Sequence, residues 1–260
     1  MDENYQTYLN RVMRMTLPET YGSQVQHIQE SPKFKRLPDQ GWQASDFPGY
    51  TVVTPCGAED SENKALFDRL ATYQAQVIQK MGGDRLAAVP PGSFHLTLAD
   101  LIWDGSYRHA KQENPDFEGQ LRDRMAQSFQ QCAALSHGQP VRFQVLGLMV
   151  MTRAVAVCLA PTDEESYDRI LKVRRAIYQN PEVIAIGIEQ QYYFTPHITL
   201  GYFGDISGLE GDRLSQAFED LNKHWLEESP QEFLVHQAQL RKFDNMTHYY
   251  REIDWPAFKF

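Results

Sequence analysis

The stretch "SFHLTLADLIW" (residues 93–103) and the later stretch "PHITLGYF" (residues 196–203) carry the same short pattern, a His followed two residues later by a Thr inside an apolar run. Side chains on a strand alternate between the two faces of a sheet, so each His shares a face with its Thr while the neighbouring Leu and Ile face a core. One such match among eight histidines is close to chance, and a lone buried His is more often a hydrogen-bonded structural residue. Two matches in matching strand contexts indicate a functional pair.

The pattern around these two stretches predicts a mixture of strands and helices in each half of the chain. Each half contains one His-Thr strand, so we predict an α+β fold built as two related lobes. We expect strands at 50–54, 85–89, 93–103, 141–151, 154–160, 196–203, 233–240 and 248–253, and helices at 4–15, 60–83, 114–132, 162–177 and 214–225. Thr162 and Glu165 are expected to form the capping box of the fourth helix.

The first 45 residues do not share this regular pattern. We interpret residues 1–45 as an N-terminal extension and residues 46–260 as a single bilobal domain, with lobes of roughly 46–140 and 141–260 that can exchange strands. The segment "ESPKFKRLPDQG" (residues 30–41) is interrupted by Pro and Gly and is expected to be an exposed connector. Its cations Lys33, Lys35 and Arg36 are read as a solvated loop, with attraction of an anion as a weaker alternative.

Composition limits the possible partners and the location. The formal net charge of −9 in 260 residues argues against electrostatic binding of duplex DNA or long RNA over an extended surface. A small anionic ligand can still enter a locally positive pocket. Three scattered cysteines indicate free thiols in a reducing compartment. The polar N-terminus lacks a signal-peptide pattern, and the apolar run 145–151 is too short to span a bilayer. We therefore expect a cytoplasmic monomer without membrane contact.

The doubled His-Thr pattern suits acid-base chemistry on a phosphate ester. An imidazole titrates near neutrality, so two of them across a cleft can act as base and acid. Threonine hydroxyls can donate hydrogen bonds to anionic oxygens. Cleavage of a phosphate ester needs both a base and an acid, because the attacking water loses a proton and the leaving oxygen gains one. A strained 2′,3′-cyclic phosphate would need little more than positioning and proton transfer.

The words "HLTL" (95–98) and "HITL" (197–200) resemble the paired His-x-Thr/Ser-x motifs of the 2H phosphoesterase superfamily, in a less characterised branch. The resemblance implies two pseudo-symmetric lobes of antiparallel strands, with flanking helices, around a central cleft. It implies that His95 and His197 are catalytic, one activating water and the other protonating the leaving ribose oxygen, and that Thr97 and Thr199 bind the phosphate. No metal or cofactor is implied, and the substrate would be a small nucleotide or an RNA terminus.

Strand alternation suggests further residues for the cleft. Counting by twos reaches Trp103 and Phe203, which can stack on a base, although the favoured reading is that both are core or rim aromatics. Weaker candidates are three tyrosines and three cations, among which the sequence does not choose: Tyr192, Tyr193, Tyr202, Arg85, Arg108 and Arg153.

The leading hypothesis is a metal-independent phosphodiesterase that hydrolyses a cyclic (2′,3′-type) or 2′-5′ phosphodiester. The alternative is a non-catalytic module that binds a nucleotide or an RNA terminus in the same cleft. A His-ligated zinc site ranks lower, because zinc takes three or four ligands and no Cys or carboxylate stands at paired spacing.

Overall fold

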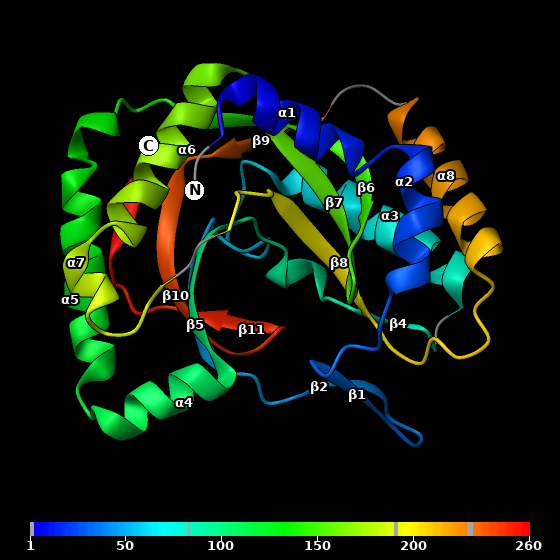
Figure 1. Cartoon of the computed structure of the whole chain (residues 1–260), viewed down its shortest axis with the longest axis horizontal. Coiled ribbons are helices and arrows are strands. Elements are labelled where there is room, and N and C mark those ends of the chain that lie inside the picture. The colour runs from blue at the N-terminus through cyan, green and yellow to red at the C-terminus, as the bar shows by residue number, and fades with distance from the viewer. Residues whose placement is uncertain (1–2, 83, 190–191, 228–230) are drawn as a thin grey trace.

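The computed structural model describes residues 3–82, 84–189, 192–227 and 231–260, which form two five-stranded sheets, a two-stranded hairpin and flanking helices (Figure 1). The predicted α+β class is confirmed. The helices are α1 (Tyr5–Arg14), α2 (Pro18–Gln24), α3 (Lys64–Met81), α4 (Asp104–Glu113), α5 (Phe117–Gln131), α6 (Glu164–Tyr178), α7 (Pro181–Ile184) and α8 (Gly211–Leu226). The strands are β1 (Phe34–Leu37), β2 (Gly41–Ala44), β3 (Gly49–Val53), β4 (Leu86–Ala88), β5 (Thr97–Trp103), β6 (Val141–Val150), β7 (Ala154–Pro161), β8 (His197–Phe203), β9 (Glu232–Val235), β10 (Gln237–Asn245), β11 (His248–Tyr250) and β12 (Ala257–Lys259).

Both sheets are antiparallel and have a fully buried strand inside them. The first sheet has the order β11-β10-β3-β5, with β12 also paired to β10, and the second has the order β4-β8-β7-β6-β9. Every residue of β3 and of β7 is buried. Their β-branched sequences, "GYTVV" and "AVAVCLAP", suit positions that are covered on both faces.

Each sheet combines strands from distant parts of the chain. The first sheet takes β3 and β5 from the first half and β10 to β12 from the C-terminal end, while the second takes β4 from the first half. The two histidine-bearing strands, β5 and β8, belong to different sheets. The division of the chain into lobes at residue 140 stays a prediction.

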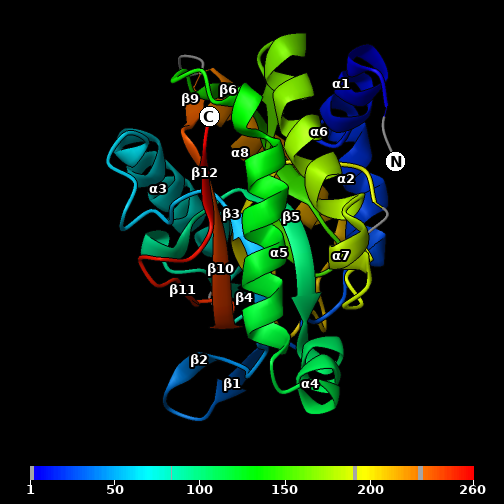
Figure 2. The same cartoon turned by 90° about the vertical axis from the view of Figure 1, so that its left-hand side faces the viewer.

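The helices cover the outer faces of the two sheets. The helices α5 and α6 lie against the first sheet, as Figure 2 shows, and α3 and α8 lie against the second. Helix α2 packs on α8, and α1 lies against β7 (Figure 1). The inner faces of the sheets are thereby left to form the site.

Residues 29–47 depart from the exposed connector that the sequence suggests. They form the hairpin β1–β2, with Phe34 opposite Ala44, and Phe34 is only 6% exposed because it stacks on Tyr202. The backbone amides of Gln29 and Ser31 donate to the carbonyls of Thr152 and Phe203, at 2.7 and 2.8 Å. The segment before the hairpin is therefore fixed against the second sheet.

Two helical features differ from the sequence prediction. Helix α4 was not expected, because Tyr107 is its one buried residue and the apolar stripe is too short to read. Helix α6 is capped by Asp163, whose carboxylate accepts from the Ser166 amide at 2.7 Å, so the predicted capping box on Thr162 is wrong by one residue.

Candidate functional site

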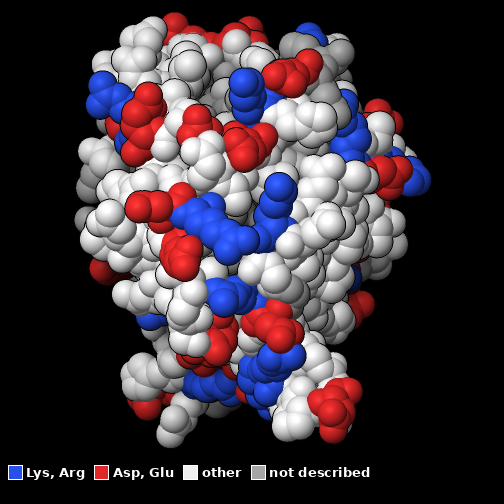
Figure 3. Space-filling view, turned by 90° about the vertical axis from the view of Figure 1, so that its right-hand side faces the viewer, with Lys and Arg blue, Asp and Glu red and all other residues white. Residues whose placement is uncertain are grey.

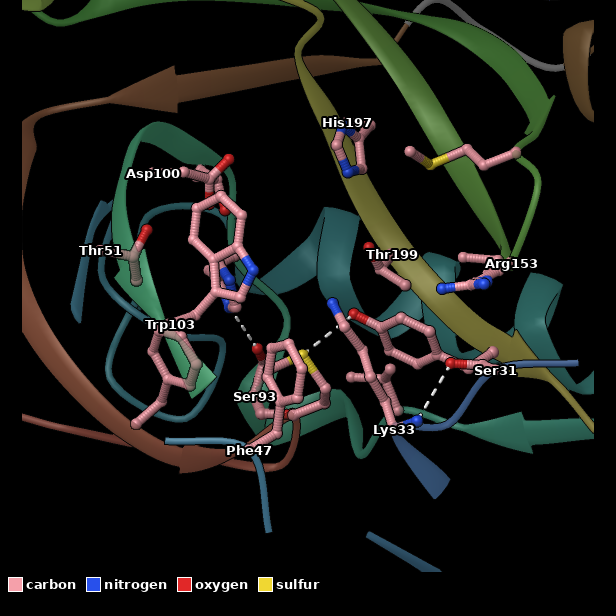
Figure 4. A pocket seen from close by; sticks show the side chains of 18 of the residues that line it. Ser31, Lys33, Phe47, Thr51, Ser93, Asp100, Trp103, Arg153, His197 and Thr199 are labelled. Carbon is pink, nitrogen blue, oxygen red and sulfur yellow. Dashed lines mark hydrogen bonds between the residues drawn. The ribbon is translucent and has the colours of Figure 1, made fainter. Parts of the chain in front are cut away.

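A cavity of about 710 Å³ lies between the inner faces of the two sheets (Figure 4). It is lined by all four residues of the doubled motif, His95 and Thr97 from the first sheet's side and His197 and Thr199 from the second. All four side chains are partly exposed, unlike the buried Leu96, Leu98, Ile198 and Leu200 that alternate with them. The structure therefore brings together the two His-Thr stretches, which lie about a hundred residues apart in the sequence.

The two histidine rings are each held by a hydrogen bond to the backbone carbonyl two residues earlier. Nδ1 of His95 lies 2.7 Å from the carbonyl oxygen of Ser93, and Nδ1 of His197 lies 2.9 Å from that of Thr195. A carbonyl oxygen only accepts hydrogen bonds, so in each ring Nδ1 carries the proton that it donates. The Nε2 atom of each neutral ring is then left with a lone pair for a substrate proton.

The surroundings keep both rings neutral in the ligand-free cleft. Burial lowers the pKa of His95 to about 4, and the charges of Arg241 and His197 add to the effect, while the Ser93 carbonyl and Asp100 oppose it. Burial also lowers the pKa of His197, with Lys33 adding and the Thr195 carbonyl and Asp100 opposing. Either ring is thus able to accept a proton at neutral pH, and either needs an incoming anion to become a proton donor.

A buried arginine supports the His95 side. The ring of His95 packs on Tyr249, with 4.4 Å between centroids, and the guanidinium of Arg241 donates to the Tyr249 carbonyl at 3.4 Å. Arg241 is 1% exposed and pairs with Glu59 and the Gln239 side chain. This network fixes the aromatic wall beside His95.

An arginine of helix α1 supports the His197 side. Arg11 donates from Nη1 to the Thr195 hydroxyl at 2.9 Å and from Nη2 to the Phe194 carbonyl at 2.7 Å. Its own position is fixed by a 2.9 Å ion pair with Glu3. The residue whose carbonyl sets the His197 tautomer is therefore tied to the N-terminal helix. No local pattern in the sequence indicates this long-range contact.

Strand β5 presents every third residue to the cavity instead of every second. Its pairing with β3 is interrupted at Leu98 and again at Leu101, so Thr97, Asp100 and Trp103 face the cleft. An extra residue in a strand reverses the facing of all that follow. Trp103 consequently lines the cavity and is 38% exposed, as expected for a base-stacking candidate, and Asp100 is a cleft residue that counting by twos misses.

Strand β8 contains one such interruption, and it corrects the expectation for Phe203. Thr199 pairs with Ala156 while Gly201 pairs with Val155, so Leu200 is the extra residue. Beyond it the facing reverses: Tyr202 lines the cavity, whereas Phe203 is 1% exposed in the core. Phe203 cannot stack on a ligand from its place in the core. Tyr202 occupies the cavity-facing position that strict alternation predicts for Phe203.

The cavity is electrically polarised. Among the described residues that line it, the cations are Lys33 and Arg153, and the anion is Asp100. Figure 4 shows Lys33 and Arg153 on the side of Thr199, and Asp100 on the opposite side with Trp103 and Thr51.

The other candidates from the sequence lie elsewhere. Arg108 pairs with Asp46 and Asp104, outside the lining of the cavity, and Arg85 is also not among the lining residues described. The Tyr192 hydroxyl donates to the Asp100 carboxylate at 2.6 Å, and Tyr192 is not among the described residues that line the cavity.

Comparison with known protein families finds a match for part of the chain. Residues 33–154 match the family model described as "2H-phosphodiest: Domain of unknown function (DUF1868)". This segment belongs to the 2H phosphoesterase superfamily. The match includes the motif of His95 and Thr97, whereas His197 and Thr199 lie beyond it.

Solved structures resemble this chain at low sequence identity. A conserved protein of unknown function from Agrobacterium tumefaciens is 16% identical, with a TM-score of 0.54 over 89% of this chain and 96% of that one. Usb1 of Kluyveromyces marxianus with uridine monophosphate is 11% identical, with a TM-score of 0.44 over 83% and 98%. LigT of E. coli complexed with 3′-AMP is 12% identical, with a TM-score of 0.34 over 82% and 98%. The first likeness shows a common fold. No curated protein matches the chain.

Two further observations concern metals and membranes. Within the described part of the chain, no group of three or more His, Cys, Asp or Glu side chains is arranged to hold a metal ion. None of the described helices combines the length and the apolar character that crossing a membrane requires.

The outer surface offers no uniform basic face in the view that carries α8. Figure 3 shows lysine and arginine side chains interspersed there with aspartate and glutamate. This mixture agrees with the net charge of −9.

Proposed function

We propose that the protein is a metal-independent phosphodiesterase that hydrolyses a cyclic 2′,3′-type or a 2′-5′ phosphodiester of a small nucleotide or RNA terminus. The observation that carries the proposal is the matched pair of histidines across one cavity, each with Nδ1 bonded to a carbonyl and Nε2 left for a substrate. Membership of residues 33–154 in the 2H phosphoesterase superfamily supports it.

The reaction needs one proton acceptor and one proton donor on opposite sides of the phosphorus atom. One neutral imidazole takes a proton from the attacking water through Nε2. The other gains its proton as the anionic phosphate enters, because a nearby negative charge favours the imidazolium form, and it passes this proton to the leaving ribose oxygen. Thr97 and Thr199 donate to the non-bridging oxygens, where negative charge accumulates in the transition state.

The test of this proposal uses the two histidines one at a time. His95→Ala and His197→Ala are each expected to lower kcat by about 10²–10⁴-fold on a nucleoside 2′,3′-cyclic phosphate, the usual worth of a general acid or base. His109→Ala, on the exposed surface of α4, serves as the control and is expected to keep full activity. Phosphorus NMR follows the conversion of the cyclic diester to the monoester.

Three outcomes would contradict the proposal. The two-histidine mechanism is wrong if either alanine variant keeps near-full activity on a substrate that the wild type cleaves. Binding without turnover would favour the non-catalytic module. Activity that EDTA abolishes and zinc restores would favour a metal site, because the mechanism above expects full activity after exhaustive chelation.

A further inference from the structure

The positive charge in the cavity is displaced from the two histidines along strand β8. His197 and Thr199 precede the interruption at Leu200, whereas Tyr202 follows it and pairs with Ala154, the residue after Arg153. Tyr202 is five positions beyond His197, which is about 16 Å of strand at the usual rise. The backbone of Arg153 therefore lies at the end of β8 away from His197.

Lys33 is held at the same end. Its Nζ lies 4.9 Å from the centre of the Phe47 ring and 5.1 Å from that of Tyr202, which leaves the amine inside the cavity between two aromatic walls. The hydrogen bonds of Gln29 and Ser31 to the second sheet fix the chain just before it. Figure 4 shows the Lys33 side chain extending into the cavity on the side of Thr199 and Arg153.

Neither cation has a carboxylate partner among the described residues. Arg153 donates to the side-chain oxygen of Gln29 at 3.2 Å, and the ion pairs of the described chain include neither Arg153 nor Lys33. Desolvation lowers the pKa of Lys33, the charge of Asp100 opposes this effect, and the charge of Arg153 adds to it. Two neighbouring cations without a carboxylate in ion-pair contact, one of them desolvated, are stabilised when an anion enters between them.

Resting on the proposed function, we propose that Lys33 and Arg153 form a second anion subsite, which takes a phosphate of the substrate other than the one that reacts between the histidines. The substrate is then a cyclic nucleotide that carries a further phosphate group, with its base on the Trp103 and Asp100 side of the cavity. That further phosphate has two possible sources, a 5′-phosphate on a mononucleotide or the internucleotide phosphate of an RNA terminus.

The experiment compares three substrates: a nucleoside 2′,3′-cyclic phosphate, its 5′-phosphorylated form, and a dinucleotide that ends in a 2′,3′-cyclic phosphate. The wild type is expected to show a kcat/KM about tenfold higher for at least one phosphate-bearing substrate than for the plain one, as for a charge-assisted contact. Lys33→Met and Arg153→Gln are expected to reduce this ratio toward one, and Lys33→Arg to retain most of it. Lys35→Met, on the exposed side of β1, is the matched control and should leave the ratio unchanged.

A preference for either phosphate-bearing substrate that Lys33→Met removes supports the subsite and identifies the source of the phosphate. The proposal is overturned if the wild type treats all three substrates alike, or if Lys33→Met lowers kcat/KM equally for all three, because Lys33 would then hold the reacting phosphate.

Calorimetry with a nucleoside 2′-monophosphate and the corresponding 2′,5′-bisphosphate separates this proposal from the proposed function. If no substrate turns over but the bisphosphate binds more tightly and Lys33→Met removes the difference, the subsite stands and the phosphodiesterase proposal fails. Equal binding of the two ligands by the wild type overturns the subsite whatever the turnover.

Discussion

His95 and His197 show how a residue acquires a chemical role from its backbone neighbour. In both cases the ring bonds to the carbonyl two positions earlier, so the tautomer is set within a three-residue segment. Because both rings point Nε2 away from that carbonyl, the chain builds the same proton acceptor twice, once on each sheet. The pair therefore differs mainly in the cations whose charges act on it, Arg241 on His95 and Lys33 on His197.

The threonine hydroxyls give a prediction at this same scale. Thr97→Val and Thr199→Val remove one donor each and nearly keep the side-chain shape. Loss of a donor in a shielded oxyanion site costs about 2.7–4 kcal/mol of transition-state stabilisation, and we expect somewhat less in this open cleft, seen as a lower kcat with the fold intact.

Thr51→Val is the control for these two variants. Thr51 lines the same cavity, but its hydroxyl already donates to the Ala99 carbonyl at 3.2 Å. Its replacement should affect kcat less than either motif threonine. Unchanged kinetics in both motif variants would show that neither hydroxyl contacts the phosphate.

At the scale of single elements, the sequence predicts most strands and helices but not the local irregularities that aim the side chains. The apolar patterns identify α3, α5, α8 and the central strands within a few residues. The extra residues at Leu98, Leu101 and Leu200 leave no mark in those patterns, because leucine suits an ordinary strand position equally well. Alternation therefore places His95, His197 and the two threonines, which precede the interruptions or span none. Beyond a single interruption it fails, as at Asp100 and Phe203, whereas Trp103 faces the cavity because the two interruptions of β5 cancel.

The hairpin β1–β2 was missed for a related reason. Its sequence is mostly polar, and it is stabilised by contacts that no local pattern records, such as Phe34 against Tyr202. As a result the local pattern predicts a solvated loop for Lys33, whereas tertiary contacts bring it into the cavity. Lys35 and Arg36 are exposed, as expected for such a loop.

Helix α1 gives a prediction at the element scale, because it reaches the site through Arg11. Arg11→Met removes both bonds to Phe194 and Thr195 and should let the Thr195 carbonyl move away from Nδ1 of His197. We expect kcat to fall about tenfold, as for a displaced catalytic group. Nitrogen-15 NMR of the imidazoles should show His197 losing its single Nδ1-protonated tautomer.

Arg14→Met is the matched control, since Arg14 is exposed on the same helix. It should change neither kcat nor the tautomer. A normal His197 spectrum in Arg11→Met, with kcat reduced all the same, would mean that Arg11 acts through general stability rather than through this carbonyl.

For the whole molecule, the neutral His95 in the cleft makes the free energy of unfolding depend on pH. The folded-state pKa of His95 is lowered to about 4 from an ordinary value of 6.5. Between these two values the unfolded chain binds more protons than the folded protein, so the free energy of unfolding falls as the pH drops through that window. At about 1.4 kcal/mol per pKa unit, His95 accounts for roughly 3 kcal/mol, present above pH 6.5 and lost at pH 4.

His95→Gln isolates this contribution. Urea unfolding at pH 7, 5.5 and 4 should show a shallower loss of stability in the variant than in the wild type. Parallel curves for the two proteins would mean that His95 titrates near its ordinary value in the folded protein.

The sharing of strands between the halves of the chain determines when the protein can fold during its synthesis. Strand β3 gains one of its two neighbours, β10, only when residues 237–245 have been made. Until then the histidine-bearing edge strand β5 rests on an incomplete sheet whose apolar faces and free edge are open to wrong partners. Pairings between such distant segments also slow folding, because long loops must close before the contacts form. The half of the site that carries His95 is therefore assembled last, although its sequence emerges from the ribosome about a hundred residues before that of His197.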